Sequence, residues 1–348
     1  MERMVPGLCV NISEKPRVFL SSRHRIQKKS HNSLHKCKNA VWLWKIFYFL
    51  PLFSMKLSRQ LLLLMMFSFL FTLEMLLGSK TVFAANIYVN SAVDSGPAAP
   101  GSIDVACNLR DAVLASNKNQ DGNGCFYSNG PNSTVVGAYG DDVIILDRIS
   151  NPIALKAQLG ELTISGNVTI QGKNKLGLPT TIDGNSAIRI FHIDESNVYD
   201  VFFYDVNVIN GKAASIGGAI LNSGDSNLTL NATSFSNNTA LDGGAIYNGN
   251  GDLTINNSTF TNNSSSKYNG GAIYTYVSAG ESLITIDGST FSNNMAKTNQ
   301  GGNGGAIYNM THGAGTAQLT VSNSTFDTNS GFEGGAIYNF DEGMERLK

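Results

Sequence analysis

The sequence predicts an all-β protein, a right-handed single-stranded parallel β-helix with a short capping helix near its N-terminus. The first observation is a repeated phrase: apolar-Thr-apolar, a Phe five residues on, an Asn three further, and then Gly-Gly-Ala-Ile. The second is that spacing inside the phrase is constant, whereas gaps between copies vary. The Gly-Gly-Ala-Ile copies begin 26, 27, 34 and 30 residues apart, at Gly217, Gly243, Gly270, Gly304 and Gly334. This combination is typical of stacked coils with loops between them.

Each coil contains two short apolar runs separated by polar turns, as in Gly243–Asn248 and Asp252–Phe260. Alternation along a strand places Leu253 and Ile255 on one face and Thr254 on the other. Neither run is long enough for a helix, and Gly, Asn and Ser bound both. A single coil cannot bury its own apolar side chains, so the coils must stack in register. The right hand of the stack follows from the crossover rule for parallel strands.

Stacking in register predicts columns of like residues, with the apolar ones inside and Gly and Asn at the corners. The Gly pair suits a corner that needs positive φ or a close backbone approach. The Asn column suits a tight turn, because Asn accepts the left-handed conformation, and its amides can bond from coil to coil. We interpret these residues as scaffold rather than as catalytic groups. The predicted scaffold positions are Gly243, Gly244, Ile246, Phe260, Asn263, Gly270, Ile273, Phe291, Asn294, Gly304, Ile307, Phe326 and Asn329.

A secretory signal peptide is predicted over residues 55–84. Leu61–Leu73 is an apolar run interrupted only by Ser68 and Thr72, with Lys56 and Arg59 before it and small residues after it. Cleavage is expected between Ala84 and Ala85. The run is shorter than the roughly 20 residues that a membrane-spanning helix needs, and an uncleaved anchor is the alternative interpretation.

Residues 1–54 form a basic segment that contains Cys9 and Cys37 and shares no repeat with the rest of the chain. Met55 begins a complete signal peptide by itself. The simplest hypothesis is that translation starts at Met55 and that residues 1–54 are a mis-assigned, disordered extension. An unusually long n-region is the alternative.

Residues 85–140 are predicted to cap the stack. The alternating run 86–90 predicts a strand, and the sequence of 109–116 predicts a short amphipathic helix. Asn108 can cap this helix, and Asp111 stands at the third helical position, where a capping partner belongs. The apolar face of the helix would plug the open end of the stack.

The repeats proper are predicted over residues 141–340. At a period near 27, the 264 residues from Ala85 onward predict on the order of eight or nine coils. Residues 341–348 are predicted to be a charged tail, which leaves the last coil of this sequence without a cap.

The charge of the exported part excludes two classes of partner. The whole chain has a formal net charge of −1. From Ala85 onward there are 12 Lys and Arg residues against 23 Asp and Glu residues, a formal net charge of −11. Such a chain is unsuited to nucleic acid and to anionic membrane surfaces. Membrane association is therefore expected only as a peripheral or surface-associated protein.

Two cysteines remain after the predicted cleavage site, Cys107 and Cys125. An even pair in an exported protein indicates a disulfide, which would close a loop around the predicted helix. Two thiols with no nearby His fall short of a tetrahedral metal site. No metal or other cofactor is predicted.

The sequence offers little for catalysis. Sugar-cleaving enzymes need Asp clustered with Lys or Arg, or two carboxylates flanking the scissile bond. Apart from His312, the only basic residues between Gly217 and Tyr338 are Lys267 and Lys297. The densest acidic spot, residues 141–147, is better explained as a solvated turn than as a calcium site. His192 is interpreted as a scaffold residue, and no catalytic residue is predicted.

Two motifs resemble known exported proteins. Cys107–Val113, CNLRDAV, resembles the Cys-Ser-Leu-Arg-Glu-Ala-Ile-type motif near the N-terminus of many exported bacterial β-helix proteins. A second Cys and a Gly-Ala-Asp-Thr-Ile-like strand commonly follow it there, similar to Cys125 and Gly140–Ile144. The repeats resemble those of chlamydial polymorphic outer membrane proteins, whose hallmarks are Gly-Gly-Ala-Ile and Phe-x-x-Asn. The resemblance implies export to the cell envelope or beyond, and often an adhesin-like role.

The sequence therefore predicts an exported, non-catalytic β-helix at the cell outer membrane, at the cell surface or outside the cell, with an adhesin-like or structural binding surface. Its ligand would be a glycan or a protein. The alternative is a secreted polysaccharide lyase or hydrolase of the pectin-lyase-like fold. Binding is expected at loops of unequal length that interrupt the repeat, since solenoid insertions collect on the binding face. These segments are 264–269, 276–282, 295–303 and 310–317.

A column of tyrosines next to the Ile column is a second candidate for binding. We interpret it either as an aromatic stripe for glycan stacking or as partly exposed scaffold. Its members are Tyr247, Tyr274, Tyr308 and Tyr338.

Overall fold

The computed structural model describes most of the chain after the predicted signal peptide, all of it within the compact unit Thr81–Lys348. The described residues are 85–95, 106–118, 125, 135–136, 141–150, 152–173, 177–297, 299 and 301–343. The predicted extension 1–54 and signal peptide 55–84 lie outside these ranges, as do residues 344–348.

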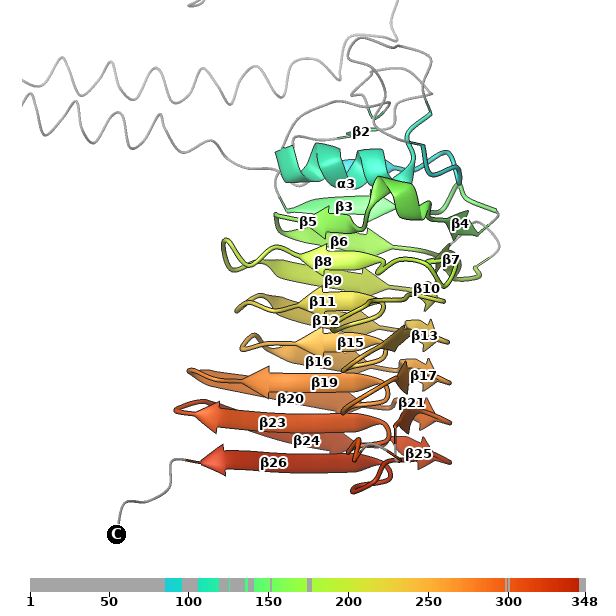
Figure 1. Ribbon diagram of the computed structural model, residues 1–348. Helices are drawn as coiled ribbons and strands as arrows, with labels where there is room; N and C mark the ends of the chain where they lie inside the picture. The colour runs from blue at the N-terminus through green and yellow to red at the C-terminus, as the bar shows by residue number, and fades with distance from the viewer. Residues whose placement is uncertain are drawn as a thin grey trace, which may run out of the picture. The chain divides into compact units, whose positions relative to one another are not determined.

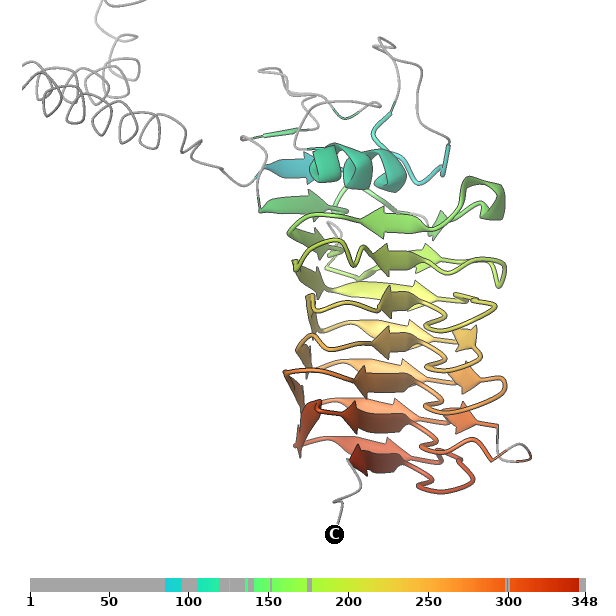
Figure 2. The same cartoon turned by 60° about the vertical axis from the view of Figure 1, so that its left-hand side comes forward.

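The chain forms a parallel β-helix whose coils stack along one axis, with the N-terminal helix at one end (Figures 1 and 2). Each full coil contributes one strand to a first sheet, one to a second sheet and one to a third sheet, and then begins again one level further along. Within the coils every neighbouring pair of strands in these sheets is parallel, as the in-register stacking of repeats requires.

The first sheet contains nine strands, in the order β2 (Val135–Val136), β1 (Asn86–Tyr88), β3 (Asp142–Ile145), β6 (Val168–Gln171), β9 (Asp200–Tyr204), β12 (Asn227–Asn231), β16 (Leu253–Asn256), β20 (Glu281–Asp287) and β24 (Thr316–Ser322). The second sheet contains β4 (Ile153–Ala154), β7 (Thr180–Asp183), β10 (Val206–Ile209), β13 (Ser234–Ser236), β17 (Thr259–Thr261), β21 (Thr290–Ser292) and β25 (Thr325–Asp327).

The third sheet contains β5 (Leu162–Ile164), β8 (Phe191–Ile193), β11 (Ile220–Asn222), β15 (Ile246–Asn248), β19 (Ile273–Val277), β23 (Ile307–Gly313) and β26 (Ile337–Gly343). A short fourth sheet consists of β14 (Thr239–Ala240), β18 (Ser264–Ser265) and β22 (Met295–Ala296). The remaining elements are the helix α3 (Leu109–Lys118) and the 3₁₀ turn η2 (Ala157–Leu159).

The number of coils is smaller than predicted. The second and third sheets each contain seven strands, which makes about seven turns rather than eight or nine. The prediction divided the whole length from Ala85 onward by one period, but residues 85–140 add only β1 and β2 to the described sheets. β26 also runs to Gly343, so the last strand extends three residues into the segment predicted to be a charged tail.

Helix α3 lies across the end of the stack, above β3 and β5 (Figure 1). It extends two residues beyond the predicted range, and Leu109, Ala112 and Val113 are buried against the core. The predicted cap at its N-terminus is confirmed, because the backbone N–H of Asp111 donates to Oδ1 of Asn108 over 3.0 Å. In the described part of the chain no helix is long and apolar enough to cross a membrane.

A buried ion pair fixes α3 to the first coils. The Arg110 guanidinium donates to both carboxylate oxygens of Asp94, over 2.9 and 3.0 Å, and to the carbonyl oxygen of Gly160 over 2.8 Å. Both side chains are almost fully buried. Each charge therefore depends on its partner, since a buried charge without one would be strongly destabilising.

The predicted disulfide between Cys107 and Cys125 is present, and both residues are fully buried. We expect the double variant Cys107→Ser/Cys125→Ser to lose about 3 kcal/mol of unfolding free energy, because the bridge closes an 18-residue loop in the unfolded chain. Urea unfolding of both proteins, with and without dithiothreitol, measures this loss. The reductant should lower the stability of the wild type only; an equal effect on the double variant would contradict the assignment.

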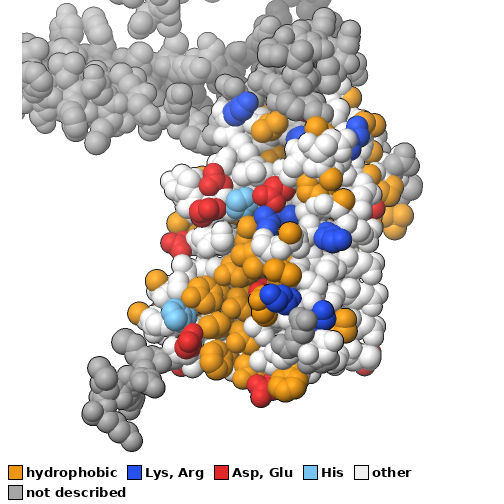
Figure 3. Space-filling model, in the orientation of Figure 1, with side chains coloured by type: hydrophobic (Ala, Val, Ile, Leu, Met, Phe, Trp, Pro, Cys, Tyr) orange, Lys and Arg blue, Asp and Glu red, His pale blue; other side chains and the backbone are white. Residues whose placement is uncertain are grey.

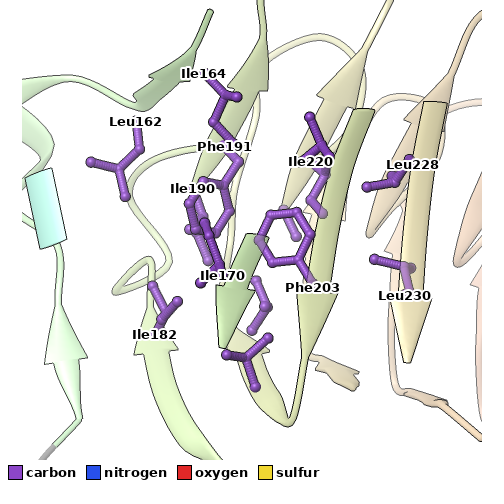
Figure 4. Close-up of a cluster of buried hydrophobic side chains, with 14 of the residues drawn as sticks. Leu162, Ile164, Ile170, Ile182, Ile190, Phe191, Phe203, Ile220, Leu228 and Leu230 are labelled. Carbon is purple, nitrogen blue, oxygen red and sulfur yellow. The ribbon is translucent and has the colours of Figure 1, made fainter. Parts of the chain in front are cut away.

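The predicted apolar columns are confirmed. Ile246, Ile273 and Ile307 pair in register on the third sheet. The phenylalanines of the second sheet stack face to face, with ring centroids 5.0 Å apart for Phe235–Phe260 and 4.7 Å apart for Phe260–Phe291. In the earlier coils, which lack the full phrase, Phe191 and Phe203 and aliphatic side chains fill the same interior (Figure 4).

The Gly pair has the two properties that its position in the phrase predicts. The first glycine of each pair has positive φ, for example 63° at Gly270 and 66° at Gly304. The second approaches the next coil so closely that a Cβ on Gly244 would clash with the carbonyl oxygen of Gly271. Only glycine meets both requirements without strain.

One of the two predictions for the Asn column is wrong: these asparagines do not form the left-handed turn. Its members do not have positive φ; the residue before each of them does, with φ of 56° at Asn262 and 54° at Asn293. The column itself is a buried ladder in which Nδ2 of Asn238 donates to Oδ1 of Asn263 over 2.9 Å, and Asn263 donates in turn to Asn294 over 3.0 Å. The predicted bonding from coil to coil is thus confirmed, and the left-handed turn belongs to the preceding position.

Candidate binding face

Seven outward-pointing side chains on β15, β19, β23 and β26 form a continuous apolar surface, which we call the binding face. They stand in two columns, because residues two apart on a strand point to the same side. Figure 3, in the orientation of Figure 1, shows an apolar patch over these strands. The first column is Tyr247, Tyr274, Tyr308 and Tyr338, and the second is Tyr276, Met310 and Phe340.

The tyrosine rings of the first column stack on one another. Ring centroids are 5.3 Å apart for Tyr247–Tyr274, 5.1 Å for Tyr274–Tyr308 and 5.4 Å for Tyr308–Tyr338, and the planes are within 18° of parallel. Each inner ring therefore turns its faces toward its neighbours and its edge toward solvent. A sugar ring stacks on a free aromatic face, so this packing fits the scaffold interpretation of the column better than the glycan stripe.

The tyrosine hydroxyls stay protonated at neutral pH. Burial, reinforced by neighbouring acidic groups including other tyrosines, raises the pKa of both Tyr247 and Tyr308 to about 12. The same causes raise the pKa of Tyr274. Its hydroxyl also lies 3.2 Å from Sδ of Met310, which joins the two columns. The face is accordingly uncharged between its borders.

All four segments that interrupt the repeat lie beside this face or within it. Segments 264–269 and 295–303 precede β19 and β23, whereas segments 276–282 and 310–317 include the last residues of these strands, among them Tyr276 and Met310. We expected the last two segments to be loops, and this expectation was wrong. They are extensions of the strands, joined by tight turns between β19 and β20 and between β23 and β24. The expected binding segments and the tyrosine column thus belong to one surface.

Charged side chains border the face on both sides. Lys267 and Lys297 come from the two segments that precede its strands, and Nζ of Lys267 lies 4.6 Å from the centroid of the Tyr268 ring. At the opposite ends of the strands, Nδ1 of His312 lies 2.7 Å from a carboxylate oxygen of Glu342, and both side chains are half exposed. In Figure 3, most Lys and Arg lie on one side of the apolar patch and His lies on the other, whereas acidic residues lie on both sides.

An ion-pair cluster lies on the third sheet beyond the N-terminal end of the tyrosine column, where β5 pairs with β8. Glu161 binds the Arg189 guanidinium over 2.8 Å and Nδ1 of His192 over 3.2 Å, and Glu195 lies 3.2 Å from the other ring nitrogen of His192. Arg189 also donates to the carbonyl oxygen of Gly217, at the corner of the next coil. The cluster links three successive coils, which supports the scaffold role predicted for His192.

The cluster predicts a pH dependence of stability. The hydrogen bond to Glu161 raises the pKa of His192 above 6.5, so its stabilising effect is complete below that pH and is lost as pH rises through the raised pKa. The hydrogen bond from His192 lowers the pKa of Glu161, whose contribution is present above about pH 4.5 and lost as pH falls further. We expect the melting temperature of the wild type to fall more than that of His192→Gln between about pH 6 and 9. Parallel curves would contradict this.

Two carboxylates at a hollow between the coils join neighbouring coils. A hollow of about 370 Å³ at the turns between the third and first sheets is lined by Asp225, Asp252 and Glu281. Asp225 accepts from Nδ2 of Asn250 over 2.9 Å, and Asp252 accepts from the backbone of Leu283 over 2.8 Å. These bonds join successive coils, and no basic side chain lines the hollow.

The acidic spot at 141–147 is also part of the scaffold. Asp142 is buried and accepts from the backbone N–H of Ala85 over 3.1 Å, and Asp141 accepts from Asn167 over 2.9 Å. Throughout the residues that the structure describes, no three His, Cys, Asp or Glu side chains are arranged to hold a metal ion.

Comparison with known proteins identifies the repeats. The family model of the Chlamydia polymorphic membrane protein repeat matches residues 232–249, 257–276 and 288–310. Comparisons with curated proteins and with solved structures gave no significant match. The matched residues contain three Phe-x-x-Asn and three Gly-Gly-Ala-Ile copies and lie in the coils that carry most of the binding face. The chain is a parallel β-helix protein with repeats of the chlamydial polymorphic membrane protein type.

Proposed function

We propose that this protein is an exported, non-catalytic β-helix that engages a partner through the binding face, as an adhesin-like or structural component of the cell surface. The observation that carries the proposal is the continuous apolar surface between segments that interrupt the repeat. An uncharged patch of this kind with a polar rim is typical of an interaction site. The repeat family itself suggests a protein of the outer membrane or surface.

The non-catalytic part of the proposal rests on what the polar side chains do. A hydrolase or lyase needs an acid, a base and a charge-stabilising group that converge on one open site. In the described coils, Glu161 binds both Arg189 and His192. At the hollow, Asp225 accepts from an Asn side chain and Asp252 accepts from a backbone N–H. Activity of the purified protein on polygalacturonate or another acidic polysaccharide would overturn this part of the proposal.

The location of the protein tests the proposal first. The protein is tagged at its C-terminus, the producing cells are fractionated, and intact cells are treated with protease. We expect the protease to degrade the tagged protein on intact cells and to leave a cytoplasmic marker in the same sample intact. Protein found only in the cytoplasm would contradict the proposal.

Beads coated with purified protein test the binding face directly. They are incubated with intact producing cells and with cultured epithelial cells, and bound beads are counted. We expect Met310→Lys, which places a charge at the centre of the face, to reduce binding at least tenfold on the cell type that binds the wild type. Lys173→Glu, an exposed change outside the third sheet, is the matched control and should bind as the wild type does.

A further inference from the structure

A carboxylate points into the solenoid at the start of its first regular coil. Asp142 begins β3 and is fully buried, on the same side of the strand as Ile144 of the core. A buried charge is costly unless an opposite charge or strong hydrogen bonds compensate it. The neighbouring Asp141 is exposed and accepts from Asn167, as is usual for an acidic side chain at a surface. The inward position of Asp142 therefore needs a physical reason.

The backbone nitrogen of Ala85 lies against this carboxylate and donates to Oδ1 of Asp142 over 3.1 Å. Strand pairing sets the contact, because Asn86 of β1 stands opposite Val143 of β3, and the N–H of Val143 donates to the carbonyl oxygen of Ala85 over 2.7 Å. Ala85 is itself fully buried and belongs to the core. The contact is thus fixed by the register of the first sheet.

The same nitrogen becomes the N-terminus when the predicted signal peptide is removed. The sequence predicts cleavage between Ala84 and Ala85. Hydrolysis by a signal peptidase consumes one water: the C–N bond between the two residues breaks, the hydroxyl group stays on the carbonyl carbon of Ala84, and the hydrogen goes to the nitrogen of Ala85. The new amino group takes up a proton and carries a positive charge at neutral pH. A neutral N–H donor beside Asp142 is thereby replaced by an ammonium group.

We infer that removal of the signal peptide creates a buried ion pair between the α-ammonium group of Ala85 and the carboxylate of Asp142, and that this pair fixes the first strand to the solenoid. The ion pair rests on the export that the proposed function includes. An amide N–H already donates to the carboxylate, and the ammonium adds a full opposite charge where water screens it little. The uncleaved chain has the contact without this charge, so its first strand is held less tightly.

The position of β1 gives the ion pair its effect on the cap. Only the two-residue strand β2 lies beyond β1 in the first sheet, and α3 packs on both β1 and β3. After the strand, the N–H of Asn90 donates to the carbonyl oxygen of Cys107 over 2.9 Å. Before the strand, Ala85 contacts Asp142. Strands near the end of a stack open more easily than those inside it. Cleavage is therefore a maturation step of the fold, because it completes the cap.

The N-terminal sequence of the exported protein is the first test. The ion pair depends on cleavage at one bond: a strand advances about 3.3 Å per residue, so each residue left before Ala85 moves the ammonium about that far and restores a neutral amide at Ala85. We expect Ala85 as the first residue. Exported protein with another first residue overturns the inference and leaves the proposed function standing, whereas uncleaved protein confined to the cytoplasm overturns both.

Hydrogen exchange measures the ion pair itself. All strands and helices that the structure describes lie within 85–348, so two forms of this chain are compared. One form begins at Ala85, exposed by a protease that cuts a fusion directly before it, and the other carries Gly-Ser-Gly in front. We expect the amides of β1 and β3 to exchange roughly tenfold more slowly in the form that begins at Ala85. The amides of β15, which lie several coils away, should exchange equally in both forms.

Variants of the two neighbouring aspartates complete the experiment. Asp142→Asn keeps an oxygen that can accept from Ala85 but removes the charge, so it should abolish the difference between the two forms. Asp141→Asn, the exposed matched control, should retain the difference. Acetylation of the Ala85 amino group in the wild type should speed exchange to the rate of the extended form, and it provides the same test if circular dichroism shows that Asp142→Asn does not fold. Equal exchange in the two wild-type forms overturns the inference, as does a difference that Asp142→Asn leaves intact.

Discussion

Gly271→Ala is expected to destabilise the protein by more than about 4 kcal/mol, the largest loss that we expect from a single methyl group in this chain. Gly271 is the second glycine of its pair, and a Cβ there would clash with the carbonyl oxygen of Gly305 in the next coil and with the backbone of Met295. These atoms are fixed by the bonds between coils, including Gly271 N–H to Gly304 O over 3.1 Å. The clash can be relieved only by separating two coils, which breaks the bonds around it.

The measurement is the midpoint of urea unfolding, followed by circular dichroism, with limited proteolysis to locate any opened coil. A repeat stack need not unfold in one step, so we expect early cleavage near the junction of β19 and β23. Gly166→Ala is the matched control, because no atom lies within 4 Å of its Cβ position and its φ is not positive. An unfolding midpoint for Gly271→Ala equal to that of the control would show that the coils adjust to the methyl group.

The columns could be predicted from the sequence because one constraint acts on every coil. In an in-register stack each residue has its counterpart as a neighbour, so a constant spacing fixes which side chains meet. Phe235, Phe260 and Phe291 follow this rule, as do Ile246 and Ile273. The constant spacing shows which residues build the scaffold. It reveals little about residues that contact a partner, because those residues need not recur in every coil.

The position of the left-handed turn could have been predicted by comparing the fourth copy of the phrase with the first three. Three copies have two consecutive asparagines, so the phrase alone does not show which one has positive φ. The fourth copy replaces the first asparagine with Thr328 and keeps Asn329. Thr328 has a φ of 54°, and Asn329 accepts the ladder bond from Asn294. The asparagine present in all four copies is thus the one whose side chain is irreplaceable, and the turn tolerates another residue.

Features that depend on register between unlike coils could not be predicted. Glu161, Arg189 and His192 lie where the phrase is incomplete, and only the pairing of Thr163 with His192 shows that they are neighbours.

The second column of the binding face was missed for a related reason. Tyr276, Met310 and Phe340 lie beyond the phrase, in segments rich in Thr, Ser and Gly that suggest loops, but their strands lengthen together because each provides backbone partners for the next.

Phe260→Ala is expected to lower the unfolding free energy by about 3–5 kcal/mol. The ring is fully buried between Phe235 and Phe291, with centroids 5.0 and 4.7 Å away. Its removal costs the transfer free energy of the ring and leaves a cavity that the neighbouring rings cannot fill, because their strands are fixed in register. Urea unfolding followed by circular dichroism gives the change in midpoint.

Two other phenylalanines provide a graded control for this loss. Phe326 continues the same column with its centroid 4.8 Å from Phe291, but it is only partly buried, so Phe326→Ala should cost less than Phe260→Ala. Phe332 is 65% exposed, and Phe332→Ala should change stability by less than about 0.5 kcal/mol. The order Phe260, Phe326, Phe332 follows burial alone, because the three substitutions delete the same atoms. Equal losses at Phe260 and Phe332 would mean that stacking of the coils, and not the filling of the interior, holds the solenoid together.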